Sequence, residues 1–147
     1  MLAEMMKYTQ VADGRIIEVF EKNDPIPAKA IYLFSHVLNA QHAWASRVLG
    51  RASLYAVWEE HAPQRFSSVS KGNFELFSSI LENVDLAKEI TYTNSIGDTY
   101  TGVVKDILFH AFNHSTYHRG QIASLFKGES IIPPVTDYIM LKREMYL

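Results

Sequence analysis

The chain has 147 residues, of which 48% are hydrophobic and 20% charged, with a net charge of -2 and no cysteine. This length and composition predict one globular domain over residues 1–147, and the weak negative charge argues against a nucleic-acid partner. Without cysteine there is no disulfide, thiolate nucleophile or sulfur ligand, so a metal site must use nitrogen and oxygen ligands. The apolar runs are too short for a membrane span and the first residues lack a signal-peptide pattern, so we expect a cytoplasmic protein.

The first part of the chain predicts two amphipathic helices separated by a proline-rich break. Apolar residues recur at helical spacing over residues 3–20, and residues 23–27 (NDPIP) interrupt the pattern. A second helix is predicted from Pro27 to Leu49, with Gly50 as its C-terminal stop. The main apolar line of this second helix consists of Leu33, Val37, Ala40, Trp44 and Val48.

The middle of the chain predicts a loop and then a third helix. Helical periodicity is lost over residues 51–70, which predicts either a pocket wall or a surface loop. For Trp58 within this loop, and for Tyr117 further along the chain, we expect core packing in preference to a position lining a pocket. The third helix is predicted over residues 71–88, where apolar residues return at three- and four-residue steps.

The last part of the chain predicts a small hairpin, a fourth helix and a tail. Residues 90–100 alternate β-branched and aromatic residues around an Asn/Gly turn, and Thr101 suits the N-cap of a helix over residues 102–126. Residues 137–147 predict a short terminal helix or a docked tail. The sequence therefore predicts an all-α fold: a four-helix bundle with a small hairpin before the fourth helix and a C-terminal tail.

Two histidines lie on the predicted buried face of the fourth helix. With about 100° of turn per residue, His114 and His118 share this face, whereas His110 and His118 are too far apart along the axis to bind one ion together with His114. On the second helix, His36 is well placed to face this pair. His42 points to another side and is the alternative if that helix is shifted. The pattern predicts a divalent-metal site at His36, His114 and His118 with an open coordination position.

The competing interpretation is that the two histidines are core residues without a metal. In that case backbone groups or the side chains of Asn39, Gln41 and Gln121 would satisfy their nitrogens. Gln121 has a second reading, as a hydrogen-bond partner that supports a metal ligand. For Arg119 we expect a solvated or dimer-interface position in preference to a role in holding an anionic substrate. The residues assign no catalytic nucleophile, acid or base.

Most of the chain resembles the DinB family of the DinB/YfiT-like superfamily, which is not the DNA polymerase of similar name. The resemblance is carried by LFSHVLNAQHAW (33–44), the hairpin around Gly97, ILFHAFNHSTYHRGQI (107–122) and PPVTDY (133–138). Its most specific part is the NHSTYHRGQ block. The resemblance implies a four-helix bundle, often dimeric, in which a helix-two histidine and the two histidines of the block hold a divalent metal. These positions correspond to His36, His114 and His118.

The resemblance also implies a range of functions. Related proteins are metal-dependent thiol transferases and a thiol-dependent isomerase, so we expect a metal-dependent thiol S-transferase or hydrolase. Its partners would be a low-molecular-weight thiol or another small-molecule substrate, and a second copy in a homodimer, without nucleic acid or membrane. Zinc or nickel is the expected metal, with manganese and iron as further candidates. The alternative is a non-enzymatic, stress-associated metal-binding or scaffold protein.

Overall fold

A computed structural model describes residues 1–147 and is mostly helical, which agrees with the expected all-α class in broad terms. The helices and strands are α1 (Leu2–Lys22), α2 (Ala28–Val48), the 3-10 turn η1 (Pro63–Arg65), α3 (Phe66–Asn83), β1 (Glu89–Thr93), β2 (Thr99–Val103), α4 (Val104–Gly128) and α5 (Tyr138–Arg143). None of the helices combines the length and the apolar character that crossing a bilayer requires.

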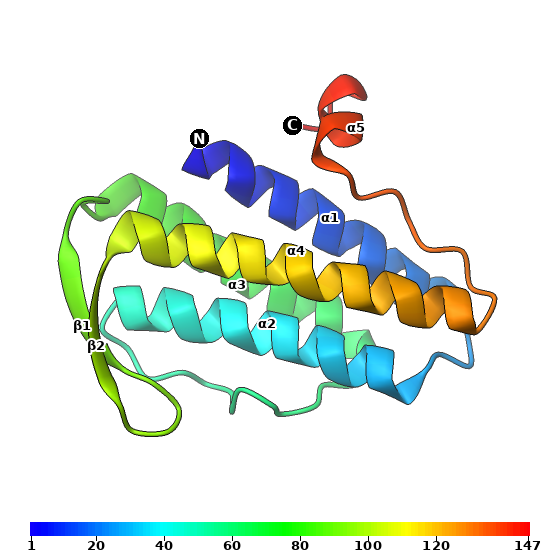
Figure 1. The fold of residues 1–147 in the computed structure, drawn as a ribbon, viewed down its shortest axis with the longest axis horizontal. Coiled ribbons are helices and arrows are strands. Elements are labelled where there is room, and N and C mark those ends of the chain that lie inside the picture. Colours follow the sequence, from blue (N-terminus) through cyan, green and yellow to red (C-terminus); the bar gives the residue numbers. More distant parts are fainter.

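The four long helices lie side by side, with α1 and α2 each packed against both α3 and α4 (Figure 1). Two aromatic-rich apolar clusters fill the space between them, one toward each end of the helices. In the first cluster, the rings of Phe20, Phe34 and Phe66 have centroids 4.9–5.5 Å apart. In the second, Phe77 and Phe112 pack 5.1 Å apart. Burial of these large side chains supplies the main driving force for the association of the helices.

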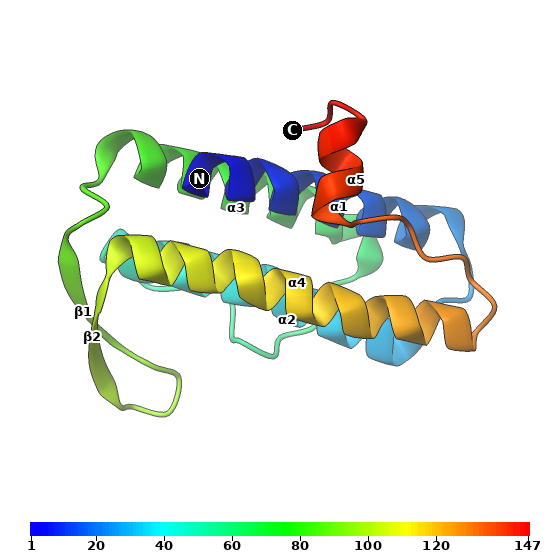
Figure 2. The same ribbon diagram turned by 45° about the horizontal axis from the view of Figure 1, so that its top comes forward.

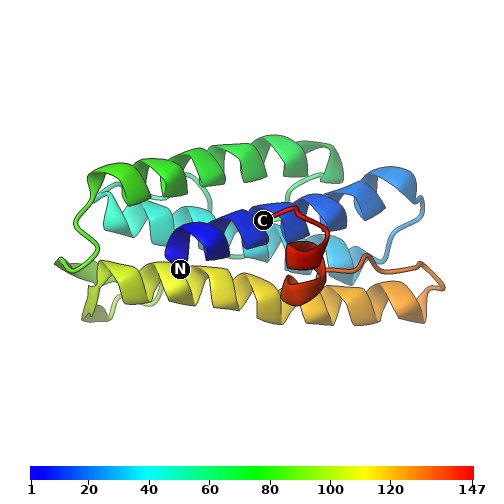
Figure 3. The same cartoon turned by 90° about the horizontal axis from the view of Figure 1, so that it is seen from above.

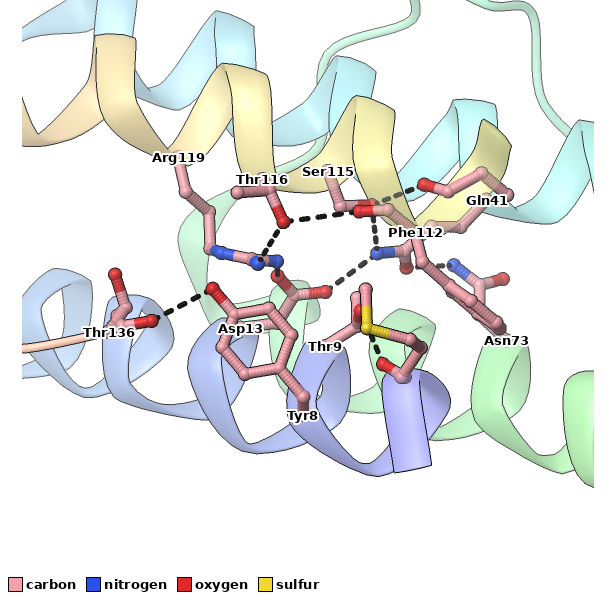
Figure 4. Close-up of polar contacts among 12 residues, drawn as sticks. Tyr8, Thr9, Asp13, Gln41, Asn73, Phe112, Ser115, Thr116, Arg119 and Thr136 are labelled. Atoms are coloured by element: carbon pink, nitrogen blue, oxygen red, sulfur yellow. Dashed lines mark hydrogen bonds and ion pairs between the residues drawn. The ribbon is translucent and has the colours of Figure 1, made fainter. Parts of the chain in front are cut away.

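A buried polar network separates the two apolar clusters and joins all four long helices (Figure 4). Arg119 donates to Asp13 at 2.7 Å, and Gln41 donates to Asp13 at 2.6 Å and to Ser115 at 3.0 Å. Asn73 of α3 donates to the carbonyl oxygen of the Gln41 side chain at 3.4 Å. Because each group would be unfavourable if buried alone, the network ties the helices in one axial register. The expectation of a solvated or dimer-interface Arg119 is wrong, since this residue is only 2% exposed.

The third helix begins and ends five residues earlier than predicted. The polar residues around position 70 suggested a loop, but Phe66 and Val69 are buried in the first apolar cluster and the helix begins with them. After Asn83 the chain becomes extended at Val84 and leads into the hairpin. The predicted range of residues 71–88 therefore contained the right helix with shifted ends.

The hairpin occupies the predicted place but extends further toward α4. Antiparallel pairing aligns Tyr92 with Tyr100 and Thr91 with Thr101, so Thr101 is a strand residue and not a helix cap. The fourth helix begins at Val104, and the residue before it, Val103, makes no side-chain capping bond. Figure 2 shows the hairpin standing at one end of the long helices, beside the start of α4.

The C-terminal tail crosses back over α1 and ends in α5 (Figure 3). Leu141 of α5 is fully buried with Tyr8 and Ala12 of α1. The Tyr8 hydroxyl donates to the carbonyl oxygen of Thr136 at 2.8 Å. These contacts dock the tail on α1. The tail also contains a short helix, so both features predicted for residues 137–147 are present.

Candidate metal centre

Three histidine side chains converge where α2 and α4 lie next to each other. His114 and His118 come from successive turns of α4, and His36 comes from α2. The His114 Nε2 atom lies 3.3 Å from His36 Nε2 and 3.1 Å from His118 Nε2. One ligand atom from each residue lies within 4.8 Å of the others. The structure therefore brings together the three residues that the sequence singled out.

In His36 and His118, the hydrogen bond made by Nδ1 indicates whether the Nε2 atom, which faces the other rings, carries a proton. His36 Nδ1 donates to the carbonyl oxygen of Val57 at 3.1 Å, because a carbonyl can only accept. His118 Nδ1 donates to Gln121 Oε1 at 2.7 Å. In the neutral form of each ring, the Nε2 atoms of His36 and His118 then carry no proton, and both face His114 Nε2.

The three rings carry too few N–H groups to give each of the facing Nε2 atoms a hydrogen bond. A single N–H on His114 Nε2 can make an ordinary hydrogen bond to only one of the two facing nitrogens, and His114 Nδ1 is buried without a partner. With the His114 proton on Nδ1, a divalent cation would accept the Nε2 lone pairs of all three rings at once. Nitrogen ligands bound at about 2.0–2.1 Å to one tetrahedral ion lie about 3.3–3.4 Å apart, close to the two contacts at His114. The donor set thus fits a metal ion.

Electrostatics keep the cluster in the form that metals bind. Burial lowers the pKa of His36. Burial, and repulsion from the neighbouring rings of His118 and His36, lower the pKa of His114 to about 4. Protonating His114 would place a charge in a desolvated site beside two further imidazoles. At neutral pH His36 and His114 are therefore neutral and would release no proton on binding a metal.

The connection between α2 and α3 forms one wall of the site. Its residue Trp58 stacks on the His36 ring with centroids 3.7 Å apart, and it also stacks with the Tyr32 ring at 5.2 Å. Trp58 is 50% exposed and Tyr117 is 64% exposed, so the expected core positions of both residues are wrong. Of the two readings of residues 51–70, the pocket wall is the one that the structure shows.

A cavity of about 390 Å³ adjoins the histidine cluster between α2, α4 and the hairpin. Its volume lies in the range of about 300–1,000 Å³ typical of small-molecule pockets. The lining residues are His36, Ala40, Ala43, Trp44, Arg47, Val57, Tyr92, Asn94, Ser95, Tyr100, His110 and His114. Two of the three histidines of the cluster thus face a space that a small molecule can enter.

The other histidines lie outside the cluster. His110 packs against Trp44 with ring centroids 5.0 Å apart, and its ring centroid lies 5.8 Å from that of His114. His42 is buried against α3, where its Nδ1 lies 3.2 Å from Asn73 Oδ1, so it does not replace His36.

Sequence reasoning missed one buried histidine. His61 is only 2% exposed and its Nε2 lies 2.6 Å from Asn39 Oδ1. It belongs to a stretch without periodicity, so no sequence signal marked it as buried. Asn39 and Gln41, which were alternative partners for the α4 histidines, bind elsewhere, whereas Gln121 does bind His118.

These features define a mostly helical protein with a buried three-histidine group that could hold a metal ion. The DinB family matches residues 29–145, and the chain belongs to this family. The match includes all three histidines of the cluster and confirms the resemblance seen in the sequence. A comparison with curated proteins finds no match.

Proposed function

We propose that this DinB-family protein binds one divalent transition-metal ion through His36, His114 and His118 and acts as a metal-dependent transferase or hydrolase. The observation that carries the proposal is the convergence of three Nε2 atoms while Val57 and Gln121 hold the protons of His36 and His118 on Nδ1. In this proposal residues 1–147 form one domain with the four-helix-bundle architecture.

The donor set favours zinc or nickel over harder metals. All three ligands are imidazoles, and no carboxylate joins the group. A bound divalent ion would supply Lewis-acid chemistry, lowering the pKa of a water or thiol in its open position. Because three neutral ligands leave the charge of the ion uncompensated, the site favours an anionic partner.

The residues around the cluster have separate tasks in this proposal. Val57 and Gln121 orient two of the three rings by accepting their Nδ1 protons. Trp58 covers one face of His36 and excludes water from that side. The adjoining cavity leaves room for a substrate next to His36 and His114. A purely structural site would be closed on all sides, so the cavity supports the catalytic reading over the scaffold.

Metal content tests the first half of the proposal. The protein is purified without an affinity tag, loaded with zinc or nickel, and analysed by elemental mass spectrometry as wild type, His118→Ala and His110→Ala. We expect about one equivalent of metal in the wild type and in His110→Ala, which removes a histidine outside the cluster, and loss of metal in His118→Ala. A folded wild type without metal would contradict the site.

Turnover tests the second half. The loaded wild type is offered low-molecular-weight thiols with electrophiles, and activated esters, with the metal-free protein as control. Metal-dependent turnover supports the enzyme, whereas stoichiometric metal without any turnover supports the non-enzymatic alternative. The low-molecular-weight thiol, the homodimer, the stress-associated role and the cytoplasmic location remain predictions.

A further inference from the structure

One arginine shares the cavity with the histidine cluster. Arg47 lies eleven residues after His36 on α2, which places it within about 20° of the same helix face and about 16 Å further along the axis. Between them the cavity is bordered by Ala40 and Ala43, whose small side chains leave a groove along the helix. Because helix side chains lean toward the N-terminus, Arg47 extends along this groove toward the histidines.

The Arg47 guanidinium is held by aromatic rings and has no anionic partner. It lies 4.3 Å from the centroid of the Trp44 ring and 5.5 Å from that of Tyr92. The other two arginines that are not exposed, Arg15 and Arg119, each pair with a carboxylate. Arg47 takes part in no ion pair. Stacking on rings covers the faces of the guanidinium plane, and its N–H groups make no hydrogen bond within the chain.

Partial burial makes this unpaired charge informative. Burial lowers the pKa of Arg47, yet a guanidinium remains protonated at all ordinary pH values. A charge that is partly shielded from water and has no opposite charge beside it is disfavoured. The positive charge of Arg47 therefore favours an anion in the cavity that it lines.

The hairpin tip completes the arginine end of the cavity. Asn94 and Ser95 line the same space, and the Asn94 side-chain oxygen accepts from the backbone N–H groups of Ile96 and Asp98 within the turn. The Ser95 hydroxyl makes no hydrogen bond within the chain. It offers a neutral donor beside Arg47. No lysine and no second arginine line this cavity.

We propose that Arg47 binds the carboxylate of a small-molecule substrate whose reacting group lies next to His36 and His114. A single guanidinium suits a monoanion, and its planar fork matches a carboxylate. The spacing along α2 requires several bonds between the carboxylate and the reacting group. The reacting end rests on the proposed metal function, whereas the anion site rests on Arg47 and the cavity alone.

Two matched probes test this assignment. 6-Mercaptohexanoate and 6-mercaptohexan-1-ol share one thiol and one chain length but differ in the anionic end. Binding is measured at low ionic strength, for zinc-loaded and metal-free protein, by calorimetry and by NMR of the Arg47 Nε–H and the Trp44 indole N–H. We expect the carboxylate probe to bind about tenfold more tightly, a difference of about 1.4 kcal/mol, and to shift both NMR signals.

Variants locate the effect. Arg47→Gln should abolish the preference for the carboxylate, and Arg47→Lys should keep part of it through charge without the fork. The matched control is Arg51→Gln, which removes an exposed arginine in the loop after α2 that does not line this cavity, and it should keep the full preference. Circular dichroism and thermal unfolding establish that each variant is folded.

The outcomes separate this inference from the metal site. An Arg47-dependent carboxylate preference in a protein that retains no zinc would support the anion site and contradict the metal function. Zinc binding with equal affinity for the two probes, or with no binding of either, would overturn the anion site. A preference that survives Arg47→Gln would overturn it as well. Tighter binding of 6-mercaptohexyl phosphate than of the carboxylate would overturn the assignment to a carboxylate.

Discussion

The Nε2 atoms of His114 and His118 lie 3.1 Å apart on successive turns of α4. His118 donates its Nδ1 proton to Gln121, so a lone pair of His118 faces the second ring. His36 Nε2 also faces His114 Nε2, at 3.3 Å, and one N–H cannot serve both neighbours. A cation bound to all three Nε2 atoms would replace these contacts and stabilise the folded state by binding it selectively. At a free zinc concentration of about 100 times Kd, the stabilisation is about 2.7 kcal/mol.

The first prediction is therefore a zinc-dependent rise in the thermal unfolding midpoint, measured by calorimetry. The wild type and the His110→Ala control should gain several degrees, while His118→Ala should gain little because it keeps only two of the three ligands. An equal gain in His118→Ala would mean that zinc stabilises the protein from another site.

The second prediction concerns the hydrogen bond that orients His118. Gln121→Leu removes the acceptor of the Nδ1 proton and should weaken zinc binding by about tenfold or more. Gln121→Glu keeps an acceptor and should retain affinity. The control Asn113→Leu makes a similar amide-to-Leu change at an exposed position of the same helix. Competition with a chelator measures the three affinities, and unchanged binding in Gln121→Leu would show that this contact plays no part.

The third prediction concerns the buried ion pair of Asp13 and Arg119, which has side-chain exposures of 0% and 2%. Arg119→Met leaves the Asp13 carboxylate buried without its cation and should lower the free energy of unfolding by about 3–5 kcal/mol. The double variant Asp13→Leu with Arg119→Met should be less destabilised, because no unpaired charge remains. Denaturation in urea measures these values.

A surface pair provides the control for this experiment. Lys22→Met removes the exposed pair with Glu18 and should change stability by about 0.5 kcal/mol or less. If the double variant of the buried pair were less stable than Arg119→Met alone, the penalty would not come from an unpaired charge.

The fourth prediction is a loss of stability in mild acid. Burial lowers the pKa of His42 and of His61, and Arg65 contributes at His61. A histidine in the unfolded chain has a pKa of about 6.5, so below that pH the unfolded chain binds protons that the folded protein does not. Stability is therefore complete above about pH 6.5 and falls as the pH drops toward the folded pKa values, by up to about 1.4 kcal/mol per pH unit for each histidine.

Urea denaturation of the metal-free protein at pH 7, 6 and 5 measures this dependence. The wild type should lose stability at each step, and His61→Gln should lose less because it removes one titrating group. An identical slope in the two proteins would show that His61 has an ordinary pKa in the folded state.

Much of the candidate site could be predicted from the sequence because it follows from helical geometry. The placement of His114 and His118 on one face depends only on the turn per residue, and His36 was the histidine of the second helix nearest to that face. The family resemblance named the same positions. The partner of His118 was also within reach, because Gln121 is one helical turn away.

Contacts between residues far apart in the sequence could not be predicted. Arg119 is separated from Asp13 by 106 residues, and nothing near either residue marks the other as its partner. The same holds for Arg47, whose cavity depends on how the hairpin folds beside α2. The start of α3 was missed because Phe66 follows a segment of polar residues, and only its packing against α1 and α2 places it in a helix.

The proposed function depends on one metal ion bound between His36, His114 and His118. Crystals of the zinc-loaded protein, measured on both sides of the zinc absorption edge, locate bound zinc directly. We expect one strong anomalous peak at about 2.0–2.1 Å from the three Nε2 atoms. Absence of a peak there, or a peak held by other residues while these three rings stay in mutual contact, would contradict it.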